Sequence, residues 1–127
     1  MKSSLSAGEF IYSILTSDQT VSGLVTKVFP VVVDSATLPY VAYRRASLDH
    51  NPTKAGLPGA DTINIDVYCY AATYSASVTL AEAVREALDY NSTEVNGMRM
   101  RSCYLTNASE GYEDDAFVQM LTFTIKI

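Results

Sequence analysis

The sequence predicts an α+β fold, in which a mainly antiparallel sheet of four to five strands has two helices packed on one face. Strict alternation of apolar and polar residues over 63–71 indicates a half-buried strand, and an apolar stripe over 75–90 indicates an amphipathic helix. Two β-rich runs joined by an acidic turn indicate a C-terminal hairpin. At 127 residues the chain has the length of one domain, so we expect residues 1–127 to form a single unit.

The N-terminal part predicts a helix followed by two extended pieces. Ser6 and Glu9 have the spacing of a capping box. The helix is expected over residues 6–16, with an apolar stripe made of Ile11, Ile14 and Leu15. A short extended piece then ends at Pro30, and a strand is expected over 40–46, where β-branched and aromatic residues gather.

A long turn-rich connection over 48–60 contains two prolines and two glycines and separates this strand from the clearest one. That strand, over 63–71, alternates strictly. One face carries Ile63, Ile65, Val67, Cys69 and Ala71, and the other carries Asn64, Asp66, Tyr68 and Tyr70. The main helix follows over about 75–90, with an apolar stripe made of Leu80, Val84, Ala87 and Leu88.

Two further strands are expected, over 98–106 and 117–127. A change of apolar parity in the first predicts a β-bulge near Arg101 and Ser102. The acidic segment 110–115 is expected to form a long hairpin tip between them.

The sheet face opposite the helices is richer in aromatic and apolar residues than a face left in water usually is. It is expected to carry Asn64, Asp66, Tyr68, Tyr70, Val118, Met120, Thr122 and Thr124. Tyrosine and methionine are enriched at protein contacts, so this face is a candidate interface, with Tyr68, Tyr70, Asp66 and Met120 as its main residues. The competing interpretation is that these side chains are simply exposed, as much apolar surface is.

Composition excludes several classes of partner. The net charge of −5 argues against nucleic acid as a direct ligand, and the few basic residues argue against adsorption to a membrane. No apolar run reaches the roughly 20 residues of a membrane helix. The N-terminus has no signal-like apolar region, so we expect assembly in a cytoplasm. Cys69 and Cys103 are expected to be buried thiols.

The sequence contains little that points to catalytic chemistry. His50 lies beside Asp49, but adjacent residues in a loop rarely hold a catalytic geometry, and no serine or cysteine nucleophile is recognisable. The acidic residues of segment 110–115 have oxygen ligands suited to a hard cation but lack the spacing of an EF-hand loop. The sequence therefore predicts no enzyme, no cofactor and no metal.

Several short segments, taken in order, resemble the tail completion family of long-tailed bacteriophages over about residues 8–127. They are Val28-Phe-Pro30, Leu38-Pro-Tyr-Val-Ala-Tyr43, Ile65-Asp-Val-Tyr-Cys-Tyr70, Ala81-Glu-Ala-Val-Arg-Glu-Ala-Leu88 and Tyr112-Glu-Asp-Asp115. The resemblance implies a structural protein of a phage or prophage, located in the tail or neck of the virion and assembled in the host bacterial cytoplasm. It implies that the protein caps the tail tube and helps to join it to the head.

The same resemblance implies a ring, possibly of six subunits, with the tail-tube protein and the neck or connector proteins as partners. A closed ring needs two different patches on each subunit. One is expected around Tyr68 and Tyr70 and the other around the loop over 48–60. Further contact candidates are Asp49, His50, Lys54, Glu113, Asp114 and Asp115. The alternatives are another neck or head-connector component, and a small ligand-binding module or enzyme with a pocket between helix and sheet.

Overall fold

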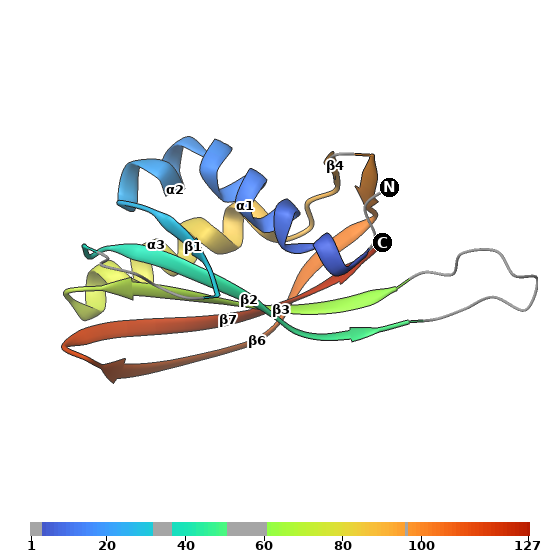
Figure 1. Ribbon diagram of the computed structural model, residues 1–127. Coiled ribbons are helices and arrows are strands. Elements are labelled where there is room, and N and C mark those ends of the chain that lie inside the picture. The colour runs from blue at the N-terminus through green and yellow to red at the C-terminus, as the bar shows by residue number, and fades with distance from the viewer. Residues whose placement is uncertain (1–3, 32–36, 51–60, 96) are drawn as a thin grey trace, which may run out of the picture.

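The computed structural model describes residues 4–31, 37–50, 61–95 and 97–127 (Figure 1). Over these residues the chain forms a five-stranded sheet in the order β1-β2-β3-β7-β6 and a separate two-stranded ladder of β4 and β5. The strands are β1 Val28–Pro30, β2 Tyr40–Asp49, β3 Thr62–Ala71, β4 Thr93–Val95, β5 Met98–Met100, β6 Ser102–Glu113 and β7 Ala116–Lys126. The helices are a 3-10 turn Ser4–Ser6, α1 Gly8–Ser17, α2 Gln19–Leu24 and α3 Tyr74–Leu88.

The α+β class is confirmed, but two details of the prediction are wrong. The sheet is mixed, because β1 pairs in parallel with β2 through Val28↔Val41, whereas the other neighbours in the sheet are antiparallel. Three α-helices, not two, occur in the described residues, and Figure 1 shows them on one face of the sheet.

The sequence does not predict the additional helix, α2, because several of its residues favour turns over helices. Asp18 is its N-cap, and its Oδ1 accepts a hydrogen bond from the backbone N–H of Val21 at 3.0 Å. The capping box predicted for α1 is absent, because Ser6 belongs to the 3-10 turn and the capping residue, Ala7, makes no side-chain bond.

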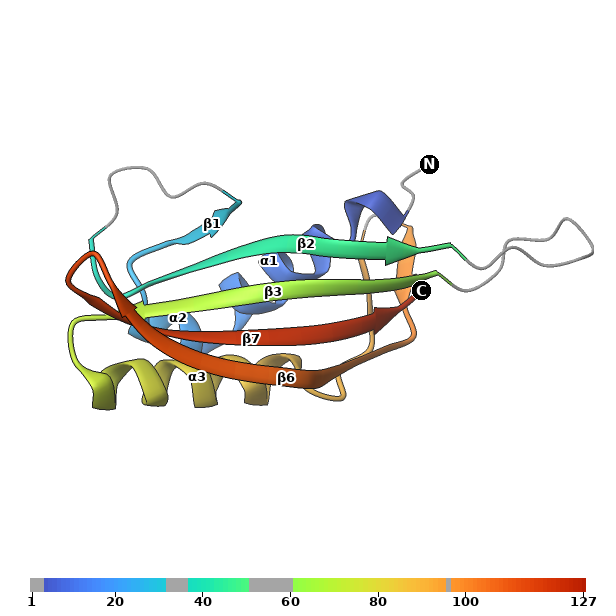
Figure 2. The same ribbon diagram turned by 90° about the horizontal axis from the view of Figure 1, so that it is seen from below.

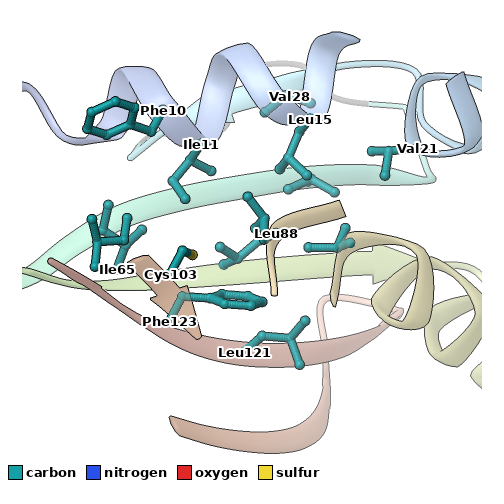
Figure 3. Close-up of a cluster of buried hydrophobic side chains, with 14 of the residues drawn as sticks. Phe10, Ile11, Leu15, Val21, Val28, Ile65, Leu88, Cys103, Leu121 and Phe123 are labelled. Atoms are coloured by element: carbon teal, nitrogen blue, oxygen red, sulfur yellow. The ribbon is translucent and has the colours of Figure 1, made fainter. Parts of the chain in front are cut away.

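The core lies between the helices and the sheet, as the apolar stripes predict. The alternating residues of β3 from Ile63 to Ala71 are fully buried. All of them except Ala71 meet α1, α3, β6 and β7 in one cluster that includes Phe10, Ile11, Leu15, Leu88, Cys103, Leu121 and Phe123 (Figure 3). Both cysteines are buried free thiols, as expected. None of the described helices is long and apolar enough to cross a membrane.

The strands are longer than the sequence indicated. β2 continues through Leu48 and Asp49, so the connection expected over 48–60 begins later, and its residues 51–60 lie outside the described part of the chain. The prediction of a long hairpin tip is also wrong, because β6 and β7 are joined by a two-residue turn. Asp114 and Asp115 have φ angles of 50° and 60°, the backbone of a type I′ turn.

The bulge predicted near Arg101 and Ser102 lies elsewhere. Arg101 is where the chain passes from β5 into β6, which accounts for the change of parity there. The register of β6 against β7 shifts between Leu105 and Asn107, so the extra residue is Thr106.

Candidate interaction surface

The face of the five-stranded sheet that points away from the helices is called the outer face here. Figure 1 shows no helix over it. The register places the expected contact residues on it together, because Tyr68 pairs with Met120 and Tyr40 pairs with Tyr70, while the alternate positions of β3 point into the core.

A row of aromatic rings crosses this face. The rings of Tyr40 and Tyr70 stack at 4.7 Å between centroids, and Tyr68 stacks on Tyr70 at 6.5 Å. Phe29 of β1 extends the row with an edge-on contact to Tyr40 at 5.9 Å. Offset stacks of this kind hold rings in fixed positions, so the row is a preorganised aromatic surface.

Tyr70 is the best anchored member of the row. Its hydroxyl donates a hydrogen bond to Oε1 of Glu113 at 3.2 Å, which joins β3 to the far end of β6. Partial burial and the negative charge of Glu113 raise the pKa of Tyr70 above its usual value, so the phenol keeps its proton. Glu113, expected as a contact residue, therefore lies beside the tyrosine row.

Asp66 plays a supporting part. Only 9 % of the residue is exposed, and its Oδ1 accepts from Oγ1 of Thr122 at 2.8 Å. Nη2 of Arg44 donates to its Oδ2 at 3.5 Å, and Nε of Arg44 donates to the hydroxyl of Tyr68 at 3.1 Å. This network of Asp66, Arg44 and Tyr68 positions the tyrosine hydroxyl and leaves the guanidinium exposed.

An open hollow of about 210 Å³ lies on the outer face beside the tyrosine row. It is lined by Tyr68, Ser109, Glu110, Gly111, Glu113, Val118 and Met120. Its walls combine an aromatic ring and apolar side chains with the carboxylate of Glu113, while the carboxylate of Glu110 is bonded on the helix side, and this mixture suits a protein side chain as an occupant.

A second group of exposed aromatic residues was not predicted. Tyr74 at the start of α3 and Tyr112 of β6 each contact Phe117 edge-on, and they are 51 % and 60 % exposed. The hydroxyl of Tyr74 donates to Oε2 of Glu110 at 2.9 Å. Strand alternation could have predicted this group, because Glu110 and Tyr112 lie two positions apart and therefore on the same face of β6. It was not predicted because the acidic segment was interpreted as a loop.

The remaining expected residues are spread over the molecule. Asp49 is exposed at the end of β2, and the strand length puts it roughly 25 Å from the tyrosine row. His50 does not pair with its neighbour Asp49 as a catalytic dyad would. Its Nδ1 instead lies 2.7 Å from Oδ1 of Asp61, across the ends of β2 and β3. Lys54 lies outside the described residues, and Asp114 and Asp115 form the hairpin turn.

The described residues offer no constellation for metal binding. No group of three or more His, Cys, Asp or Glu side chains in them is arranged to hold a metal ion. Glu110 and Glu113 lie on opposite faces of β6, because three positions separate them along a strand.

The described residues also form a hollow on the helix side of the sheet, where the enzyme alternative expects a pocket. This second hollow of about 230 Å³ lies where α1, α2 and β1 meet. It is lined by Tyr12, Leu15, Thr16, Ser22, Val25, Thr26, Lys27 and Val28, so its described lining contains neither a histidine nor an acid.

Comparison with known proteins shows where this architecture belongs. The fold matches a chain of the virion of a native gene transfer agent particle with a TM-score of 0.74 at 18 % identity, covering 91 % of this chain and 90 % of that one. It matches the gp17 protein of bacteriophage SPP1 with a TM-score of 0.67 at 20 % identity, covering 98 % and 90 %. No curated protein sequence matches the chain. The model of the family "Tail completion protein gp17" matches residues 9–127, nearly the whole sequence, and the chain therefore belongs to that family.

Proposed function

We propose that this phage tail completion protein, a structural component of the virion tail, caps the tail tube and helps to join it to the head as a ring of its own copies. Membership of the family supports the tail role. The observation that carries the ring proposal is the uncovered outer face, where rigidly stacked tyrosines lie beside an open hollow. Tyrosine supplies a large contact area at a low cost in side-chain entropy, which is why it is frequent at interfaces.

A closed ring requires two different surfaces that meet when one copy is rotated onto the next. We assign one of them to the outer face around Tyr68, Tyr70, Asp66 and Met120. The other is the end of β2, with Asp49, His50 and the connection that includes Lys54. The hairpin end, with Glu113, Asp114 and Asp115, borders the tyrosine row and belongs to the first surface.

The other partners follow from the position in the virion. A structure of similar fold comes from a whole virion particle, which supports assembly with other tail or neck proteins. The tail-tube protein and a neck or connector protein are the partners we propose. A role as a different neck component would depend on the same kinds of contact. Binding distinguishes the two roles: a tail cap binds isolated tail tubes, and another neck component binds isolated heads.

The test removes the tyrosine row and keeps the fold. Tyr68→Ala with Tyr70→Ala deletes two half-buried rings of the outer face. A matched control, Tyr12→Ala with Tyr90→Ala, deletes two tyrosines that are 47 % and 85 % exposed on other parts of the molecule. Light scattering over rising protein concentration measures self-association. Sedimentation with purified tails that lack the protein measures docking.

We expect the wild type and the control variant to associate and to bind tails, and the outer-face variant to lose both by at least about tenfold, as hot-spot aromatics do. Unfolding in urea confirms that each variant is folded. A wild-type protein that stays monomeric and ignores isolated tails refutes the proposed function.

A further inference from the structure

Strand β6 is one rim of the five-stranded sheet, and only part of that rim is covered (Figure 2). Near its start the rim is satisfied by the segment after α3. The carbonyl of Cys103 accepts from the N–H of Tyr90 at 2.6 Å, and the N–H of Leu105 donates to Oδ1 of Asp89 at 3.0 Å. After the bulge at Thr106 no described residue bonds the outward backbone groups of the rim.

The tight turn identifies which backbone groups those are. A two-residue hairpin is closed by a hydrogen-bonded pair, here Glu113 with Ala116, and hydrogen-bonded and non-hydrogen-bonded pairs then alternate along an antiparallel ladder. The N–H and C=O groups of Ala108, Glu110 and Tyr112 therefore point away from β7. Cys103 and Leu105 have the same outward orientation, which their bonds to the α3 segment confirm.

This open rim, residues 107–113, is protected against pairing only by the bulge before it and by its two glutamates. It contains no proline and no lysine, its residues are exposed, and no described segment lies over it. Its two acidic side chains are held to the sides of the strand. Glu110 accepts from Tyr74 and from Nε2 of Gln119 on the helix side, and Glu113 accepts from Tyr70 on the outer face. The rim is thus an unpaired backbone row with one negative charge on each face.

Charge decides what can pair with it. Two copies of the rim placed side by side bring Glu110 and Glu113 of each copy into one short ladder, and like charges opposite each other are unfavourable. The net charge of −5 adds to this repulsion. An extended segment with lysine or arginine at two positions three residues apart places one cation on each face, opposite the two carboxylates.

We propose that the open rim of β6 binds an extended, basic segment of another virion protein as an added sixth strand. Backbone hydrogen bonds to Ala108, Glu110 and Tyr112 supply affinity, and the two glutamates select the cations. This inference rests on the proposed tail role only for the source of the segment, because the geometry of the rim is independent of it.

The experiment tethers a strand to the chain of residues 1–127. Ile127 follows Lys126, which pairs with Ser102 at the start of β6. Ser102 lies roughly 20 Å from Ala108 along the strand. A flexible Gly/Ser linker of about 12 residues has an average end-to-end distance of that size. The appended seven-residue strand contains threonine and valine with two lysines three positions apart. The matched control carries glutamates in place of the lysines. Amide hydrogen exchange at Ala108, Glu110 and Tyr112, followed by NMR, is the readout.

We expect the lysine strand to slow exchange at these three amides by about tenfold or more, since tethering supplies millimolar effective concentration, and the glutamate strand to leave it unchanged. Ala108→Pro removes one outward N–H without touching the ladder to β7. It should return Glu110 to fast exchange, whereas Ala108→Thr should not.

Three results overturn the proposal: no protection with the lysine strand, equal protection with both strands, or protection in the untethered protein that rises with its concentration. The last result identifies a second copy as the occupant. Because no tail enters this experiment, failure here leaves the proposed function standing. Failure to bind isolated tails leaves the rim result standing.

Discussion

Asp89, just after α3, holds the helix to the edge of the sheet, and its removal tests this junction. Its Oδ1 accepts from the backbone N–H of Leu105 at 3.0 Å, and its Oδ2 accepts from Nε of Arg85 at 3.2 Å, with only 10 % of the side chain exposed. Asp89→Ala leaves the Leu105 amide without an acceptor, which costs about 1–3 kcal/mol. The Arg85 pair adds little, about 0.2–1 kcal/mol, because the arginine is half exposed.

We therefore expect Asp89→Ala to lower the free energy of unfolding by about 2 kcal/mol in urea titrations. Arg85→Ala should cost under about 1 kcal/mol, and Asp89→Asn should fall between the two because its amide oxygen still accepts from Leu105. Amide exchange at Leu105 should accelerate in Asp89→Ala and stay slow in Arg85→Ala. An Asp89→Ala protein as stable as the wild type, or an Arg85→Ala protein equally weakened, refutes the assignment of the junction to the backbone bond.

Three other predictions concern separate features. Burial and a neighbouring carboxylate raise the pKa of Tyr70 above the ordinary 10.0, so stability present below pH 10 is lost as pH rises beyond it, and Tyr70→Phe should flatten this loss in alkaline urea titrations. Burial raises the pKa of Cys69 and of Cys103 to about 12, so neither thiol should react with a disulfide reagent at pH 8 until urea unfolds the chain, and fast reaction in the native state would contradict their burial. The turn formed by Asp114 and Asp115 has positive φ at both positions, so Asp114→Asn with Asp115→Gly should stabilise the protein by about 0.5–1 kcal/mol, and an unchanged or lower melting temperature would argue against a type I′ turn.

Local periodicity was enough to predict the parts of the fold with one buried face. The alternation over Ile63 to Ala71 and the stripe of α3 each identify an element, because each residue's face follows from its position alone. What periodicity could not show is which strands are neighbours. The parallel pairing of β1 with β2 depends on contacts between the two strands, and three residues of β1 carry no directional signal.

The candidate site was predicted in part for the same reason. Tyr68, Tyr70 and Met120 share one face by parity, and the structure brings them together. Asp66 shares this face by parity as well, but its hydrogen bonds to Thr122 and Arg44 could not be predicted, because they depend on register across strands, which one strand's sequence does not contain. The acidic segment looked like a loop because glutamate, glycine and aspartate favour turns, yet pairing with β7 made most of it a strand.

The bulge at Thr106 lets β6 hold one residue more than β7 while the pairs on both sides of it keep their places. Leu105 lies opposite Phe123 and Asn107 opposite Thr122, so the extra residue is absorbed locally. Deleting Thr106 would make these two residues consecutive in a regular ladder, with Glu110 still opposite Gln119 and the amides of Ala108, Glu110 and Tyr112 still at the boundary of the sheet. Position 106 is therefore a place where the chain can lose a residue without changing the lateral surface of the molecule.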